Sequence, residues 1–249
     1  MPRVPRRVVA LMLASSAAVA ACAGAAAGGT GLAAATERTT SAGTADYTLS
    51  VSASFSGALI STRSQGAISF RAHEAHVYKI VPGEPLPEEE IVAGPWTYAN
   101  SNASAALSNP NAKPWTKVDT RRLPAAQRIG ELDHIRALAY LSSGASGAKL
   151  VGTSGALAHW RGSVDPARVL AHVPASQRAT MRTILRADYA KGVFPADFWL
   201  DAQSRLRRVR VAYKTAKGTG FTIVGTFSGF GTRVDVKPPP ARSTTDITP

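Results

Sequence analysis

Apolar and polar residues alternate strictly over residues 47–55, which places Tyr47, Leu49, Val51, Ala53 and Phe55 on one face. This period of two predicts a half-buried β-strand. More strand-like sequence follows on both sides of Gly66, and residues 77–81 continue the pattern. Short connections between such segments are typical of an antiparallel meander.

Two polar segments interrupt the meander. Residues 82–90 contain three prolines and an acidic run, and residues 101–114 are rich in Ser, Asn and Pro. Both are predicted to be loops, the first of them exposed. Between them, Trp96 and Tyr98 are two positions apart and are predicted to share a strand face. Residues 115–118 predict a further short strand.

The middle of the chain has a helical period. After Pro124, apolar residues form one broad stripe, composed of Ile129, Leu132, Ile135, Leu138 and Leu141. A helix with such a stripe must pack it against another element. Asp165 followed by Pro166 predicts a helix start with a capping carboxylate, and Pro174 predicts the start of a further helix. Residues 149–153 and 156–162 predict strands before these helices.

The last part of the chain predicts strands again, at residues 198–200, 209–213, 221–227 and 234–236. Pro238 to Pro240 end the last of them, and residues 241–249 are predicted to be a disordered tail. The order of strands, helices and strands predicts an α+β domain over residues 46–240, with helices on one face of a large antiparallel sheet.

The N-terminus has the pattern of an export signal. Arg3, Arg6 and Arg7 precede an uncharged run over residues 8–20, which is the order found in secretory signal peptides. Val19-Ala20-Ala21-Cys22 resembles the lipobox of bacterial lipoproteins. That resemblance implies removal of residues 1–21 and attachment of a lipid to the Cys22 thiol. An uncleaved membrane anchor and an ordinary cleaved signal are the alternatives. Residues 22–45 are small and polar and predict a flexible tether.

The net charge limits the classes of binding partner, and the cysteine count limits how the domain can be stabilised. The chain has a formal charge of +13 and one cysteine, so no disulfide within the chain can hold the domain together. The positive charge favours anionic surfaces, which for an exported protein are lipid headgroups and acidic cell-wall polymers rather than nucleic acid. Arg178, Arg182 and Arg186 repeat at helical spacing. They indicate either a solvated helix face or a contact surface for an anionic headgroup or polymer.

Four segments, in this order, carry a resemblance to a known family. They are residues 155–165 (GALAHWRGSVD), 195–201 (PADFWLD) with Arg205 to Arg208, and 227–238, together with the lipobox. The order resembles the LolA-like fold and the actinobacterial LppX/LprG-type lipoproteins. The resemblance implies a curved sheet, or half-barrel, that wraps helices and leaves an apolar cavity between them. The chain departs from the family at Trp160, where an aromatic hydroxyl is expected, and at the turn Gln203-Ser204.

No catalytic or metal-binding motif emerges from the sequence. His73 and His76 are three positions apart, not the four that place two ligands on one helix face. The Gly-x-Ser-x-Gly elbow, a phosphate loop and a dinucleotide fingerprint are absent. We therefore expect a protein that is not an enzyme and that needs no metal or cofactor.

Two functions remain open. The first is a lipoprotein on the outer face of the bacterial cell membrane that carries a lipid or lipidated glycoconjugate, acts as a monomer and exchanges its ligand with an envelope transporter. The candidate cavity residues are Leu49, Val51, Phe55, Ile68, Phe70, Ile135, Leu138, Val209, Val211, Phe221 and Ile223. The second is a tethered interaction or sensor module with a filled core and a basic docking surface.

Overall fold

A computed structural model of the chain describes residues 28–55, 58–80, 86–100, 103, 109, 111–188, 192–214 and 220–249. Within these residues, strands form one sheet in the order β12-β6-β5-β4-β3-β2-β1-β11-β10-β9-β8-β7. Neighbouring strands are antiparallel except for the parallel pair β12–β6. The strands are β1 (Thr44–Phe55), β2 (Ala58–Ser69), β3 (Glu74–Ile80), β4 (Glu88–Ala93), β5 (Trp96–Ala99), β6 (Trp115–Asp119), β7 (Ala145–Ser154), β8 (Leu157–Val164), β9 (Phe194–Leu200), β10 (Leu206–Lys214), β11 (Gly220–Ser228) and β12 (Thr244–Asp246).

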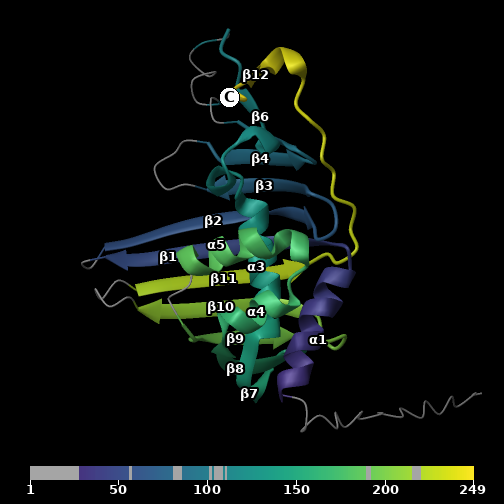
Figure 1. Cartoon of the computed structure of the whole chain (residues 1–249), viewed down its shortest axis with the longest axis vertical. Helices are drawn as coiled ribbons and strands as arrows, with labels where there is room; N and C mark the ends of the chain where they lie inside the picture. The colour runs from purple at the N-terminus through teal and green to yellow at the C-terminus, as the bar shows by residue number, and fades with distance from the viewer. Residues whose placement is uncertain are drawn as a thin grey trace, which may run out of the picture.

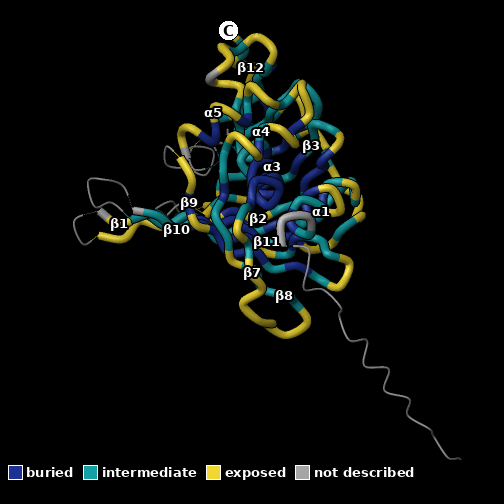
Figure 2. Tube along the Cα trace, turned by 60° about the horizontal axis from the view of Figure 1, so that its bottom comes forward, coloured by how far each residue is buried: buried dark blue, intermediate teal, exposed yellow. Residues whose placement is uncertain are grey.

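The helices lie on one face of this sheet, which we call the inner face (Figure 1). They are α1 (Gly28–Ser41), α3 (Glu131–Tyr140), α4 (Pro166–His172) and α5 (Arg178–Asp188). Helix α3 is the most deeply buried and lies at the centre of the fold (Figure 2). The predicted α+β architecture, a large curved antiparallel sheet around helices, is therefore confirmed. Among the described residues, no helix is both long and apolar enough to cross a membrane.

Helix α3 is held by its apolar stripe. Leu132, Ile135 and Leu138 are each at most 2% exposed. The helix approaches β11 closely at Gly225, where an added Cβ would lie 2.8 Å from Leu138 Cδ1. Glycine at this position therefore lets helix and sheet meet without a gap. The helix begins at Glu131, later than Pro124 suggests, because Pro124 precedes a separate 3₁₀ turn.

The expected tether is wrong for residues 28–41, which form α1. Leu32, Ala35 and Thr39 on this helix are each at most 1% exposed. The Thr39 hydroxyl donates to the carbonyl of Ala35 at 2.7 Å and accepts from the amide of Leu206 at 2.8 Å. The small side chains of this helix each bury little apolar surface, but they let the helix approach α3 and β10 closely.

The exposed loop predicted over residues 82–90 is also partly wrong. Its last three residues begin β4, which continues into the buried residues Ile91 and Val92. The amide of Glu89 donates to Asn100 Oδ1 at 2.6 Å across the β4–β5 hairpin. The apolar pair after the acidic run therefore draws Glu88 to Glu90 into the sheet.

The C-terminus differs from prediction in two ways. Residues 234–236 form no strand, although Val234 is buried. The predicted disordered tail instead includes β12, whose Thr244 to Asp246 pair with Trp115 to Lys117 of β6. The amide of Asp119 donates to the Thr248 hydroxyl at 3.0 Å and fixes the end. A three-residue strand has no periodicity that sequence reading detects.

The packing of α1 gives a testable consequence. Leu32→Ala should lower the free energy of unfolding by about 2–5 kcal/mol, since it empties a fully buried site. Glu37→Ala on the exposed side of the same helix should change it by less than about 0.5 kcal/mol. Urea denaturation measures both. Equal effects of the two changes would mean that α1 is not packed on the domain.

Candidate functional site

The predicted cavity residues mostly fill the core. Eight of them are buried there, namely Leu49, Ile68, Phe70, Ile135, Leu138, Val209, Val211 and Ile223. Val51 is partly buried against the same core, and the side chain of Phe55 lies outside the described residues. Of the predicted set, only Phe221 lines one of the pockets described below. The inner face behind α3 is thus closed by side chains in this conformation.

The largest of these pockets lies at one end of the strands and has a volume of about 710 Å³. Its lining residues are Ser52, Ser54, Leu59, Val193, Phe194, Pro195, Ala212, Tyr213, Gly220, Phe221 and Thr222. Strand register shows which face it occupies. Thr222 pairs with Ser52 and Ala212, one position from the core-facing row of Val51, Ile223 and Val211. Since side chains alternate along a strand, Ser52, Ala212 and Thr222 line this strand-end pocket from the outer face.

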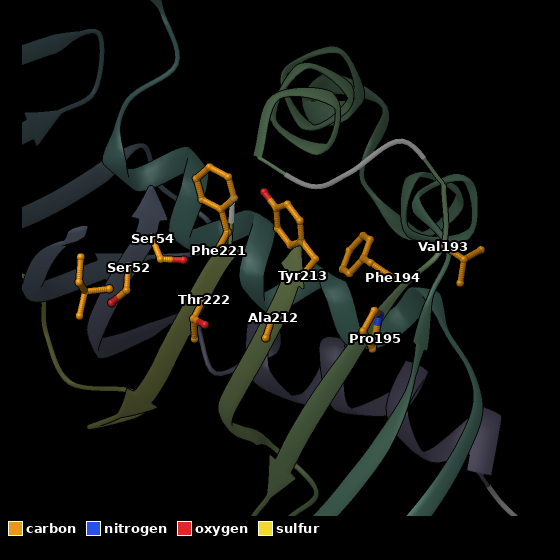
Figure 3. Close-up of a pocket in the computed structure, with 11 residues that line it drawn as sticks. Ser52, Ser54, Val193, Phe194, Pro195, Ala212, Tyr213, Phe221 and Thr222 are labelled. Carbon is orange, nitrogen blue, oxygen red and sulfur yellow. The ribbon is translucent and has the colours of Figure 1, made fainter. Parts of the chain in front are cut away.

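Aromatic side chains occupy the inner face at the same strand ends. Phe221, Tyr213 and Phe194 point toward the side of the helices, whereas Thr222 and Ala212 point the opposite way (Figure 3). The rings of Tyr213 and Phe221 stack with centroids 5.4 Å apart. The strand ends therefore carry apolar surface on both faces.

A second region lies inside, between the sheet and helices α3 and α5. Two adjoining pockets of about 230 and 180 Å³ share His73, Thr120, Arg128 and Asp133. They are lined by residues of β4 to β6 and by the N-terminal part of α3. This is the space in which an apolar cavity was predicted, but charged side chains such as Arg128 and Asp133 lie among the apolar residues of its walls.

Glu90 is the most perturbed carboxyl group of this inner region. Burial, and after it the neighbouring carboxylate of Glu131, raise the pKa of Glu90 from 4.5 to about 7, and Lys79 opposes this shift. Glu131 is held in place because Ser64 Oγ donates to its Oε1 at 2.5 Å. Burial also lowers the pKa of His73, so the imidazole is predominantly neutral at pH 7. Near neutral pH, a protonated Glu90 can donate a hydrogen bond here.

Arg136 of α3 lines the same inner region. Its guanidinium donates to the carbonyls of Ser69, at 2.7 Å, and of Ala72. Burial lowers the pKa of Arg136, and the charge of Asp133 opposes this. The first hydrogen bond ends on the last residue of β2 and the second on the loop that follows, so Arg136 positions the start of that loop.

A charged ladder crosses the outer face of β8, β9 and β10. Asp197 accepts from His159 Nε2 at 2.9 Å and from Arg161 Nε at 2.8 Å. Burial raises the pKa of Asp197, but these two hydrogen bonds outweigh it and lower the pKa overall. The His159 ring stacks on Trp199 at 4.4 Å, and the guanidinium of Arg208 lies 4.7 Å from a Trp199 ring. The cluster joins three strands.

The remaining predicted residues are placed as follows. Arg178, Arg182 and Arg186 all lie on α5 and are exposed, and Arg178 Nε donates to the carbonyl of Val173 at 2.9 Å. Their role as an anionic contact surface stays a prediction. Cys22, the predicted lipidation site, lies outside the described residues. Among the described residues, His, Cys, Asp and Glu form no group of three or more placed to hold a metal ion.

Sequence reading missed two features of these sites. Glu90 was assigned to an exposed loop, although Ile91 and Val92 directly after it indicate a buried strand. Leu59 and Ile60 were read only as strand residues. They are two adjacent large apolar residues close to Gly57, and this break in the alternation is a signal that one of the two faces away from the core.

The fold has similar solved structures. The lipoprotein LppX of Mycobacterium tuberculosis is 15% identical, with a TM-score of 0.46 over 83% of this chain and 98% of its own. A LolA-superfamily protein of Nitrosomonas europaea is 9% identical, with a TM-score of 0.33 over 86% and 96%. A chain of the Pseudomonas aeruginosa MucA/MucB complex is 12% identical, with a TM-score of 0.35 over 85% and 62%.

No family model matches the chain, and no curated protein matches it in sequence. All three TM-scores are below 0.5, and all three identities are below 25%. These values are too low to carry over a ligand, a partner or an activity from these proteins.

The raised pKa of Glu90 predicts a pH dependence of stability. At Glu90 the folded state binds more protons than the unfolded state between pH 4.5 and about 7, so the contribution of Glu90 to stability should fall as pH rises through this window. The lowered pKa of His73 acts in the opposite direction below pH 6.5. The loss should be at most about 3 kcal/mol. Glu90→Gln should remove this slope, whereas Glu37→Gln on α1 should keep it. Urea denaturation at several pH values measures the slopes, and identical slopes for the two variants would contradict the assignment.

Proposed function

We propose that the protein is a lipoprotein tethered to the outer face of a bacterial cell membrane, and that it binds an apolar ligand such as a lipid or lipidated glycoconjugate. The carrying observation is the strand-end pocket of about 710 Å³ with Leu59 and Val193 at its rim. This volume lies within the usual range of about 300–1,000 Å³ for ligand sites. The proposed attachment to the membrane is based on the lipobox-like pattern of Val19 to Cys22.

The chemistry of this pocket suits a hydrocarbon chain. Pro195, Ala212 and Thr222 present small groups along its floor, and Leu59 and Val193 are 71% and 63% exposed. Each CH₂ group that leaves water gains about 0.8 kcal/mol, so a chain laid along this floor binds without any reactive residue. Exposed apolar side chains at the rim lose water when the ligand arrives.

A second candidate function is a tethered interaction module. It is supported by the filled core behind α3 and by the exposed Arg182 and Arg186 on α5. Replacing Arg178, Arg182 and Arg186 with Glu separates the two functions. A ligand-binding protein keeps its bound lipid after this change, whereas a docking module loses its envelope partner.

Lipid occupancy tests the first function. Protein purified from membranes and then reloaded with bacterial envelope lipid should yield bound lipid on extraction and mass spectrometry. Ala212→Phe projects into the strand-end pocket and should reduce occupancy about tenfold, the equivalent of roughly 1.4 kcal/mol. Gln65→Phe is a matched control, because Gln65 is exposed and does not line the pocket.

Two results would count against the proposal. One is the absence of bound lipid from the unaltered protein after reloading. The other is equal occupancy in the Ala212→Phe and Gln65→Phe variants, which would place any bound lipid elsewhere.

A further inference from the structure

Strands β1, β2, β10 and β11 project beyond the helices at one end of the sheet (Figures 1 and 2). Large apolar side chains are exposed there. Leu59 is 71% exposed, Ile60 57%, Ile80 53% and Val193 63%. Leu59 and Ile60 lie at the beginning of β2, and Val193 precedes β9 and lines the same pocket as Leu59. Ile80 pairs with Arg63 and therefore lies further back along the sheet. We call Leu59, Ile60 and Val193 the apolar tip.

The apolar tip faces in two directions. Leu59 pairs with Ser54 and therefore lies on the outer face, whereas Ile60 pairs with Ala53 on the inner face. A protein partner that covers one face of the sheet leaves the apolar side chain on the other face in water. A lipid bilayer surrounds a projecting tip from all sides, so it is the environment that removes both side chains from water.

A positively charged residue lies on β2 at a distance from the tip that matches the depth of the lipid phosphates. Arg63 is exposed on β2 and pairs with Ile80. Three residues of strand separate Arg63 from Ile60, which is about 10 Å at roughly 3.3 Å per residue. The headgroup layer of a bilayer is about 5–8 Å thick, so Arg63 reaches the phosphates when Ile60 reaches the hydrocarbon. Arg186 on α5 is exposed as well.

We propose that the apolar tip enters the interface of an anionic phospholipid bilayer, with Leu59 and Ile60 in the hydrocarbon and Arg63 among the phosphates. The docking goes beyond the proposed function, because it requires neither a ligand in the strand-end pocket nor a lipid on Cys22. It also fixes an orientation. Leu59 both lines the strand-end pocket and belongs to the tip, so the pocket lies next to the membrane surface and an apolar chain can pass between bilayer and pocket.

A fluorescent probe tests the docking directly in the full chain. Cys22 is the only cysteine, so Cys22→Ser with Ile60→Cys allows an environment-sensitive dye to be attached at residue 60 alone. Leu150→Cys is the matched control, because Leu150 is 54% exposed on β7 at the edge of the sheet. Vesicles of phosphatidylcholine with phosphatidylglycerol should raise the emission intensity of the dye at residue 60 several-fold and shift it to the blue. The emission of the dye at residue 150 should stay unchanged. Phosphatidylcholine vesicles alone should have a much smaller effect.

Substitution of the tip provides the second measurement. With the dye at Val193→Cys, Leu59→Glu combined with Ile60→Glu should weaken vesicle binding at least tenfold, whereas Leu150→Glu combined with Val151→Glu should not. These residues are exposed, so the fold should survive both changes. Equal responses at residues 60 and 150, equal responses to neutral and anionic vesicles, or unchanged binding by the Leu59 and Ile60 variant would each overturn the proposal. Protein stripped of lipid should still dock, which separates this result from a failure of ligand binding.

Discussion

The pairing of β1 with β11 is the interaction on which the rest of the structure depends. Asp46 to Ser54 pair with Ser228 to Gly220, which joins the first strand of the sheet to the last long one. One side of this seam carries β2 to β6 and β12, and the other carries β10 to β7. Helix α3 covers the seam from the inner face, with Leu138 against Gly225. Because strand and helix contacts meet here, the two halves share one core.

The two halves differ in the chemistry of their inner faces. On the β9 to β11 side, Phe198, Val209 and Ile223 pack against the helices and exclude water. On the β2 to β4 side, Ser64 and Glu90 face the first turn of α3, which brings Glu131 close to Glu90. Burial of a carboxyl group favours its neutral form. The apolar half is thus filled, and the other half retains small pockets in which polar groups such as Glu90 and Asp133 lie beside apolar ones.

Hydrophobic periodicity in the sequence predicted those strands and helices that have one apolar and one polar face. The alternation in β1, the stripe of α3 and the Asp165 cap of α4 were read correctly, and the Asp165 carboxylate accepts from the Ala167 amide at 2.8 Å. The same reading failed where burial depends on distant contacts. Helix α1 buries alanines and threonines, whose packing is decided by how closely its partners approach. The strand β12 exists only because β6 offers an unpaired edge. The positions of the pockets followed from register and helix length, neither of which the pattern contains.

The exposed strand ends follow from the lengths of the elements. Strands β1 and β2 have twelve residues each, about 40 Å of extended chain at roughly 3.3 Å per residue. Helices α3 and α5 have ten and eleven residues, only about 15–17 Å at 1.5 Å per residue. Neither of these two helices can cover strands of that length from end to end. The uncovered end of β2 carries the exposed apolar side chains of Leu59 and Ile60. Apolar residues at a place that the fold cannot cover indicate that their environment is supplied from outside the chain.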